Sequence, residues 1–469
     1  MVPVVGFWSD QRSINSADLG RLLTGGTVAT SGKTRTFRTI VAPDADLGAI
    51  ASAVGVAAAP SVKGLSVAAI KSAVNASLNT VGLLRVDDVT PDVRVLAIDG
   101  VSLFGAERLK DVTQWPLSIP TLKPSAFATS QVWTLDSAGD VNLDREDYYL
   151  SITRGKGVDY PWNGGTAEFS RLVCCNNLGF SNAVARRTGN AGAVRTLLTS
   201  ADLSFINLEG AVPDDFKPTM TGYSFQFDPQ MLTGIKNAGI DGVDLANNHL
   251  CNAGTQGVTE TLANLDLAGI AHAGAGNNIA AARKPAMFQA NGVKVALLGY
   301  DDRQGSCWAR ASRPGSAGYN VTAIKADIKT ARNAGAQIVV VMLHWGTEYS
   351  DAVPGWMRRD AETLMTSGAD LVLGSHPHWV GQIEAMSRPQ GDGFTIFSMG
   401  NFVFDLTHDE RTEEGVILDF TFVGTRLAQV EIHPTIIVDR AQPNLMNPAL
   451  TGSRVLNRMQ ATSSKHLNW

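Results

Sequence analysis

The sequence alternates short apolar runs with longer segments of helical periodicity, and this alternation limits the fold more than any other feature. The apolar runs predict strands at residues 132–135, 203–207, 242–246, 293–300, 337–343 and 371–373. Apolar residues at helical spacing predict helices at residues 257–268, 321–334 and 356–366. Strands that alternate with helices indicate an α/β domain with a central sheet. From Gly415 onward, two adjacent strands at 416–423 and 427–433 predict an antiparallel end to the domain.

The length of 469 residues exceeds what a single core usually accommodates, so we expect more than one domain. Residues 1–125 form a first unit, with strands at 2–7, 81–86 and 93–98 and a helix at 16–24. Pro116, Pro120 and Pro124 predict a linker after it. The α/β domain then covers residues 126–440, and residues 441–469 are expected to form a C-terminal tail.

Charge and composition exclude some kinds of partner. The net charge is -5, from 39 basic and 44 acidic residues, which gives no general attraction to nucleic acid or to an anionic membrane. No apolar run approaches the ~20 residues of a transmembrane helix, and no signal peptide is visible at the start of the chain. The four cysteines have no metal-type spacing and predict no disulfide framework, and a bond between the adjacent Cys174 and Cys175 is expected to be too strained to form.

Polar residues follow the predicted strands at the points where the strands end. They are Asp140, Glu209, Asn248, His249, His344, His376, His378 and, after a short strand at 394–397, Asn401. The carboxyl ends of strands in an open α/β sheet are where ligand sites form. His376 and His378 flank Pro377, so an extended backbone would point both imidazoles to one side. Each residue alone has an ordinary structural explanation, as a turn, a cap or a packed core histidine, but their joint occurrence favours a metal site.

The mixture of oxygen and nitrogen ligands indicates the kind of metal. Such a set suits Mn, Fe or Zn better than Mg. There are too many ligands for one tetrahedral zinc ion, so we expect two divalent ions that share a carboxylate. His249 directly follows the predicted ligand Asn248, so it can face the substrate as a general acid.

Six segments resemble the CapA family of capsule (poly-γ-glutamate) synthesis proteins, within the calcineurin-like metallophosphoesterase superfamily. They are GDVNLDR (139–145), INLEG (206–210), DLANNHLCNAGTQGVTETLANLDLAGIAHAGAG (244–276), LHWGTEY (343–349), GADLVLGSHPHW (368–379) and SMGNFVFD (398–405). The resemblance implies a four-layer α/β sandwich with a dinuclear metal site. Asn142 stands where the superfamily has a histidine ligand, and Glu209 where it has a bridging aspartate.

The same resemblance implies partners and a location. It implies action on poly-γ-glutamate or another envelope polymer or phosphoester, capsule synthase subunits as partners, and an extracytoplasmic place in the cell envelope. Residues 1–125 resemble part of a type 2 periplasmic solute-binding protein, on the phrases ADLGRLLTGG and VGLLRVDDVTPDVRVLAIDGV. That second resemblance implies an α/β lobe at the front of the chain, and one hypothesis is that this lobe senses a small anion.

Two functions from different classes stay open at this point. The first is a metal-dependent hydrolase or phosphoesterase that acts in capsule formation or processing. The second is a non-catalytic protein that keeps the same fold and binds polyglutamate or serves as a scaffold in a capsule synthesis or export complex.

Overall fold

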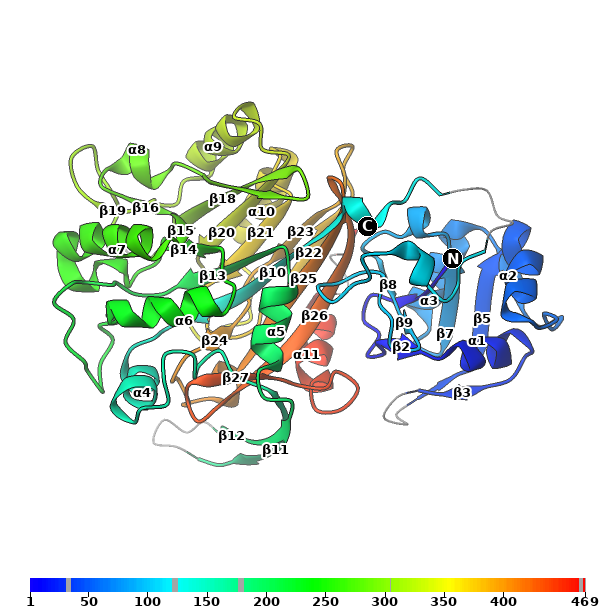
Figure 1. Ribbon diagram of the computed structural model, residues 1–469. Helices are drawn as coiled ribbons and strands as arrows, with labels where there is room; N and C mark the ends of the chain where they lie inside the picture. Colours follow the sequence, from blue (N-terminus) through cyan, green and yellow to red (C-terminus); the bar gives the residue numbers. More distant parts are fainter. Residues whose placement is uncertain (31–34, 120–124, 176–180, 304, 464–466, 469) are drawn as a thin grey trace.

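The computed structural model describes the chain except for residues 31–34, 120–124, 176–180, 304, 464–466 and 469. A smaller part, here called the N-terminal lobe, lies beside a larger part, here called the main lobe (Figure 1). Pro120 and Pro124 of the predicted linker lie outside the described residues, and Pro116 is described.

The N-terminal lobe has a core of its own. Its sheet has the order β6 (Lys63–Leu65), β5 (Thr39–Pro43), β7 (Thr80–Leu84), β1 (Val2–Gly6), β8 (Val93–Val95). Its helices are α1 (Ser16–Leu23), α2 (Leu47–Val54) and α3 (Val67–Ala76), and its short strand pairs are β2 (Ser13–Ile14) with β9 (Ala97–Ile98) and β3 (Val28–Ala29) with β4 (Thr36–Phe37). Most buried apolar side chains of residues 2–117 form one cluster, which Val132 and Ala428 of the main lobe join, whereas Phe7 packs in the core of the main lobe.

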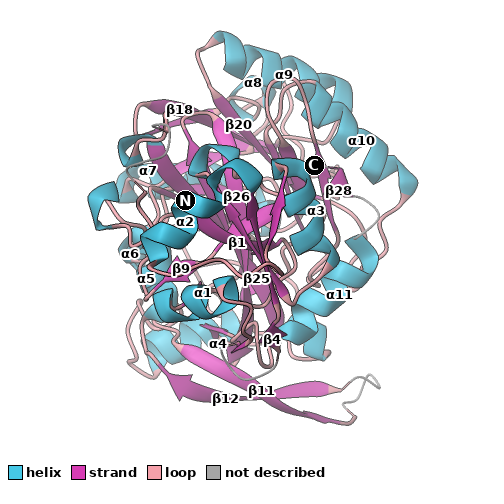
Figure 2. Cartoon of the chain, turned by 90° about the vertical axis from the view of Figure 1, so that its right-hand side faces the viewer, coloured by secondary structure: helices cyan, strands magenta, loops and turns pink. Residues whose placement is uncertain are grey.

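The main lobe contains a ten-stranded sheet. Its order is β12 (Asn182–Gly189), β11 (Thr166–Val173), β27 (Gln442–Leu445), β26 (Arg426–Val438), β25 (Glu414–Val423), β10 (Val132–Val141), β13 (Leu203–Leu208), β14 (Gly242–Asp244), β15 (Ala271–Ala273), with β24 (Asn401–Val403) also paired to β10. Strands β10, β13, β14 and β15 run parallel, whereas β25 is antiparallel to β10. Strands β11 and β12 extend as a hairpin at the lower edge of the molecule (Figure 2).

A seven-stranded sheet packs against the ten-stranded one. Its order is β17 (Ala286–Ala290), β18 (Val293–Asp301), β20 (Ile338–His344), β21 (Leu371–Ser375), β23 (Gly393–Ile396), β22 (Ile383–Met386), β28 (Leu467–Asn468). Strand β20 is buried throughout and apolar up to Leu343, because both of its faces are covered. Its residues Val340 and Met342 join the core between the two sheets, whereas Val339 and Val341 join a core on the other face.

Helices cover the outer face of each sheet. On the ten-stranded sheet they are α5 (Ala193–Ser200), α6 (Leu232–Asn237) and α7 (Gly254–Ala268), and on the seven-stranded sheet α9 (Val321–Asn333) and α10 (Gly355–Thr366). Short elements complete the lobe: α4 (Arg145–Tyr148), α8 (Ile279–Ala282), and β16 (Ala275–Gly276) paired with β19 (Gly315–Ser316). The structure therefore confirms a mixed α/β fold rich in sheet.

Two predictions differ from the structure in their details. The strand predicted at 242–246 ends at Asp244, because the Asp244 carboxylate accepts a hydrogen bond from the backbone N–H of Ala246 at 2.9 Å and turns the chain. The expected C-terminal tail is largely ordered: β27 and β28 each extend a sheet, and helix α11 (Ser453–Ser463) buries Val455, Leu456 and Met459.

The cysteine prediction is wrong. Cys251 bonds to Cys307, and Cys174 bonds to Cys175 across a cis peptide. Cys251 and Cys307 are 56 residues apart, so only the fold brings them together. Among the described residues, no helix is both long enough and apolar enough to cross a bilayer.

Candidate metal centre

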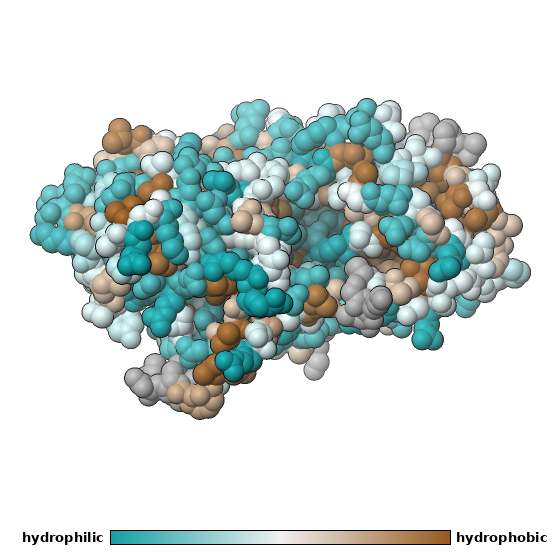
Figure 3. Space-filling view, turned by 60° about the horizontal axis from the view of Figure 1, so that its bottom comes forward, coloured by the Kyte–Doolittle hydropathy of each residue, from teal (hydrophilic) through white to brown (hydrophobic). Residues whose placement is uncertain are grey.

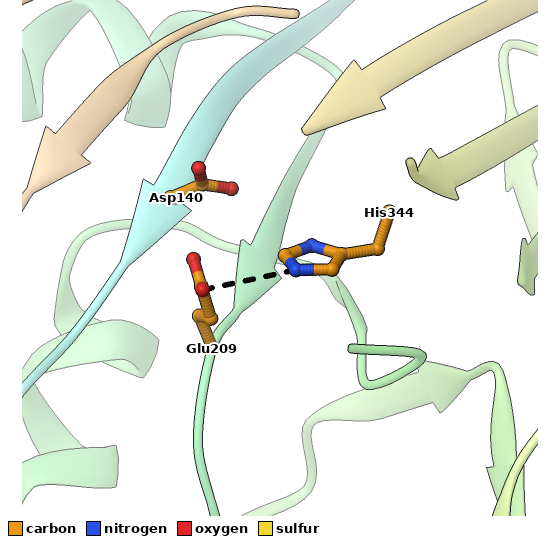
Figure 4. Close-up of side chains that lie close together, drawn as sticks. All are labelled: Asp140, Glu209 and His344. Atoms are coloured by element: carbon orange, nitrogen blue, oxygen red, sulfur yellow. Dashed lines mark ion pairs between the residues drawn. The ribbon is translucent and has the colours of Figure 1, made fainter. Parts of the chain in front are cut away.

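The carboxyl ends of both main-lobe sheets meet at one buried point. Asp140 is near the end of β10, Glu209 follows β13, and His344 is the last residue of β20. One ligand atom of each lies within 4.8 Å of the others, and all three side chains are fully buried (Figure 4). We call Asp140, Glu209, Asn248, His249, His344, His376 and His378 the strand-end site.

Asp140 is held by a close approach of two strands. A side chain at Gly139 would meet the Gly400 carbonyl oxygen at 1.9 Å, so glycine lets β10 lie against the segment that leads into β24. The Asp140 backbone N–H donates to that same carbonyl at 3.0 Å. Asn207 Nδ2 donates to Asp140 Oδ1 at 2.8 Å, which orients the carboxylate toward the site.

Glu209 is the unusual member of the site. Among the described residues no group donates a hydrogen bond to either of its oxygens, and the side chain has no solvent exposure. Its Oε1 lies 3.7 Å from His344 Nε2 and 3.7 Å from His249 Nε2. Burial, and then the neighbouring Asp140 carboxylate, raise the pKa of Glu209 well above its usual value. A buried carboxylate without donors is costly unless a cation lies beside it, so these residues fit a metal ion.

His344 has its two ring nitrogens in different surroundings. Nδ1 lies 3.0 Å from Ser375 Oγ, at the end of the neighbouring strand β21. Nε2 faces the site, 2.7 Å from Asn248 Oδ1 and 3.1 Å from His376 Nδ1. Burial, and then His376, lower the pKa of His344 well below its usual value, which keeps the imidazole in the neutral form that binds metals.

The backbone around the histidine pair is not extended, contrary to the prediction. His376 has φ of 92° and His378 has φ of 60°, both in the left-handed region that non-glycine residues rarely adopt. The two rings nevertheless lie near each other, with centroids 6.2 Å apart. The turn around Pro377, rather than strand periodicity, brings them together. Strain of this kind is typical of residues that function holds in place.

His378 lies between a carboxylate and an amide. Its Nδ1 is 3.3 Å from Asp140 Oδ2 and 2.8 Å from Asn401 Oδ1. Burial alone would lower its pKa, but the Glu209 and Asp140 carboxylates raise the pKa of His378 to about 9. The site therefore attracts positive charge.

His249 is oriented by the loop that follows it. Its Nδ1 lies 2.9 Å from Asn252 Oδ1, which leaves Nε2 directed toward Glu209. Its ring lies against Phe225, with centroids 4.1 Å apart, and the Arg145 guanidinium lies over the Phe225 ring at 4.7 Å from its centroid. Burial lowers the pKa of His249 to about 4, so the imidazole is neutral at pH 7.

Asn142 contributes differently from the other predicted ligands. Its Oδ1 accepts the backbone N–H of Asp144 at 2.9 Å, and its Nδ2 has no partner among the described residues. The amide oxygen, the atom that could bind a metal, is therefore used to shape the turn after β10.

Several residues that orient the site were not predicted from the sequence. They are Asn207, Ser375 and Asn252, together with the two cations Arg145 and Arg303. Asn207 lies two residues before the predicted ligand Glu209, and Ser375 one residue before His376. This proximity in the sequence could have identified both as residues of the site. A hollow of about 460 Å³ opens onto the site and is lined by Asn248, Arg303, Thr347, Glu348 and His376.

Comparison with known proteins gives the family. The family described as "Bacterial capsule synthesis protein PGA_cap" matches residues 134–406, more than half of the chain. The chain therefore belongs to the PGA_cap family, and its similarity to proteins of poly-γ-glutamate capsule formation is established.

Two curated relatives support this assignment. The capsule biosynthesis protein CapA of Bacillus anthracis is 28% identical over 244 residues, which cover 51% of this chain and 58% of that protein. The PGA biosynthesis protein CapA of Bacillus subtilis is 27% identical over 276 residues, which cover 58% of this chain and 71% of that protein. The match thus extends over only part of each relative.

Solved structures show a more distant likeness. A calcineurin-like phosphoesterase of Bacillus subtilis, YfkN, aligns with a TM-score of 0.36 and 11% identity, over 71% of this chain and 97% of that one. A likeness of this size supports no conclusion about activity.

Proposed function

We propose that this chain is a metal-dependent hydrolase that acts in the formation or processing of a poly-γ-glutamate capsule. The observation that supports this most strongly is Glu209, a fully buried carboxylate without hydrogen-bond donors that faces two imidazoles. The order of layers in the main lobe, helices on the outside and two facing sheets within, supports a four-layer sandwich of the metallophosphoesterase kind.

The residues of the strand-end site offer two groups of ligands. Asp140 and His378 form one group and His344, Asn248 and His376 form the other, with Glu209 between them. We assign two divalent ions to these groups, with Mn, Fe or Zn favoured over Mg by the nitrogen ligands. When bound, such ions act as Lewis acids and make water more acidic.

The chain's own groups would position a substrate around that centre. Asn252 fixes the His249 ring, so that the unshared pair on Nε2 can accept a proton from an approaching group. This is a change from the predicted role of general acid. Arg303 lines the hollow that opens onto the site, and a cation there suits a polyanionic polymer such as polyglutamate.

The disulfide between Cys251 and Cys307 supports an extracytoplasmic location. Disulfides persist in oxidising compartments and are rare in the cytosol. We keep the envelope polymer and capsule synthase subunits as the proposed partners. The relation of residues 1–125 to a solute-binding protein also stays a proposal.

The alternative is a non-catalytic protein that binds polyglutamate or holds synthase subunits together. It is favoured by Asn142, which stands where the wider superfamily has a histidine ligand, yet points its oxygen at the backbone of Asp144. On this alternative, the metal would stabilise the fold without turnover.

An assay of the purified chain separates the two functions. Poly-γ-glutamate and a phosphodiester are offered with and without Mn²⁺, to the wild type, to His249→Ala and to the matched control His272→Ala, a histidine paired with the exposed Asp266. We expect turnover that depends on Mn²⁺ and that His249→Ala alone abolishes while metal content is retained. Metal without turnover on either substrate would favour the scaffold, and absence of both would contradict the proposal.

A further inference from the structure

A cavity of about 600 Å³ lies between the two lobes. One wall is the N-terminal lobe, with Arg12 and the segment 102–107, and the other is the main lobe, with β11, β25 and β26. A second hollow of about 390 Å³ shares Glu107, Asn190 and His433 with it, so the two form one cleft. The space-filling view shows a hollow between the lobes that is lined by hydrophilic residues (Figure 3). We call it the interface cavity.

Three carboxylates form a row across the sheet beside this cavity. Asp136 on β10 pairs with Asp419 on β25, and Asp419 pairs with Glu431 on β26. Directly opposite residues share one face of a sheet, about 5 Å apart. We call these three residues the acidic row. Side chains of a strand alternate between the two faces of its sheet. Leu135 and Phe420, which neighbour the acidic row in sequence, pack in the core between the two sheets, so the row lies on the opposite face.

The N-terminal lobe contacts this same face. The backbone N–H of Ala106 donates to Asp419 Oδ2 at 2.8 Å, and that of Gly105 donates to Thr421 Oγ1 at 3.0 Å. The N–H of Val95 donates to Gln429 Oε1 at 2.7 Å. The cavity is therefore framed by an interface that polar contacts hold in place.

Part of the negative charge is already balanced. Glu431 Oε1 lies 2.5 Å from Arg12 Nε, and Asp10 Oδ2 lies 3.2 Å from Arg35 Nε. Arg12 also donates to the backbone carbonyls of Ile432 at 2.8 Å and Ser9 at 3.4 Å, which holds its guanidinium in place.

Three lining carboxylates have no ion-pair partner within the described part of the chain. Among the described residues no Lys or Arg forms an ion pair with Asp419, Glu107 or Glu168, all of which line the cavity. Asp419 is only 2% exposed and its Oδ1 has no hydrogen-bond partner. Glu107, by contrast, is exposed at the rim. The acids thus stand at two levels, one deep and one near the opening.

Apolar side chains also line the cavity. Leu103, Phe104, Leu197, Leu445 and Met446 line the cavity. The shape and chemistry therefore suit a ligand with a hydrocarbon middle and a positive charge at each end.

Burial and neighbouring charges make the ionised form of Asp419, the deeper acid, unfavourable when no cation is bound. Burial, and then the Glu431 carboxylate, raise the pKa of Asp419 to about 7. Burial and Asp419 raise the pKa of Asp136 well above its usual value. A cation that enters the cavity would favour the ionised form of Asp419 and relieve this penalty.

We propose that the interface cavity binds a linear organic diammonium ion, with one ammonium group at Asp419 and the other at Glu107 and Glu168. The site is separate from the strand-end site and does not depend on the proposed hydrolase function. Its ligand would bridge the two lobes and so stabilise their arrangement.

Titration calorimetry of the full chain with 1,4-diaminobutane tests the proposal. We expect saturable binding tighter than about 1 mM, weakened about 10–100-fold by Asp419→Asn, which loses one charged hydrogen-bond partner. Glu168→Gln should weaken binding less, and butylammonium should bind less tightly than the diamine. Asp215→Asn, at an exposed acid paired with Lys217, is the matched control and should bind like the wild type. Asparagine can still accept the Ala106 N–H, so the variant is expected to fold.

Several outcomes would overturn the proposal. The first is that the diamine gives no heat of binding, and the second is that the wild type and Asp419→Asn bind it equally well. The third is that Mg²⁺ or phosphate, and not the amine, binds at this cavity. Equal affinity for the mono- and diamine would overturn the two-ended arrangement. Glu209→Gln should leave diamine binding unchanged, so failure here and failure of the metal site are distinguishable.

Discussion

The strand-end site and the acidic row both bury carboxylates, but their surroundings differ. Glu209 has no hydrogen-bond donor and faces the imidazoles of His249 and His344. In the acidic row, Glu431 is paired with Arg12, and Asp419 accepts a backbone N–H. Burial alone thus does not identify a metal ligand. Asp136 of the row also lacks a hydrogen-bond partner among the described residues, so this lack does not by itself mark a metal ligand. The difference is that imidazole nitrogens face Glu209, whereas the members of the acidic row face one another, Arg12 and a backbone donor.

Of the variants that test this difference, Glu209→Gln should have the largest effect. Removing the central carboxylate is expected to lower the affinity for divalent metal by more than the ~10–100-fold typical of residues outside the ligand set, with turnover lost as well. Metal content by mass spectrometry is the measurement, and Asp419→Asn is the control, which should keep full metal content. Equal metal content in both variants would show that the two regions do not differ as described.

The strand-end site is also tied by a covalent link, which the acidic row lacks. Cys251 lies two residues after His249 and bonds to Cys307, 56 residues away. Cys251→Ser should therefore lower the free energy of unfolding by about 3–4 kcal/mol, because the bond restricts the unfolded chain. Urea unfolding gives the value, and Cys307→Ser should cost the same. Unfolding curves that do not change on adding a reductant to the wild type would contradict the link.

A smaller change should show that the imidazoles need their partners. Ser375→Ala removes the hydroxyl 3.0 Å from His344 Nδ1, and metal affinity should fall about 10–100-fold. The control is Ser137→Ala, a fully buried serine on β10 whose hydroxyl donates to the Phe205 carbonyl at 3.2 Å. Metal titration of both variants is the test, and a similar loss in both would assign the effect to packing alone.

The smallest effect concerns how the acidic row responds to pH. The pKa of Asp419 is about 7 in the folded chain and its ordinary value is 3.8, so the folded state binds the extra proton between these values. The contribution of Asp419 to the free energy of unfolding is full below about pH 4 and is lost as the pH rises through 7. From pH 5 to 7 this contribution should lower the free energy of unfolding by on the order of 1 kcal/mol per pH unit.

Asp419→Asn should flatten that dependence, although Asp136, whose pKa is also raised, keeps part of it. Thermal or urea unfolding at several pH values measures the slope. A slope that is unchanged in the variant would contradict the assignment of the raised pKa.

The sequence predicted the strands and the convergence of their ends because both depend on local pattern. The run at 337–343 became β20 (Ile338–His344) because alternate residues meet two apolar faces. Glu209 and His344 were found because polar residues follow buried strands. The backbone of His376 and His378 was not predictable, since a positive φ at a non-glycine residue is imposed by the surrounding fold.

Other features depend on distant parts of the chain. The pairing of Cys251 with Cys307 and the interface cavity require the three-dimensional arrangement, because their residues lie far apart in the sequence. Helix α11 was not among the predicted helices, because the stretch from residue 441 was expected to form a tail.

Anomalous scattering from crystals of protein purified without chelators tests the metal site most directly. Data collected at the Mn, Fe and Zn edges should show peaks within bonding distance of Asp140, Glu209 and His344, which gives the identity and number of the ions together. Maps without a peak at this point after soaking in Mn²⁺, or with a peak beside Asp419 in its place, would contradict the account.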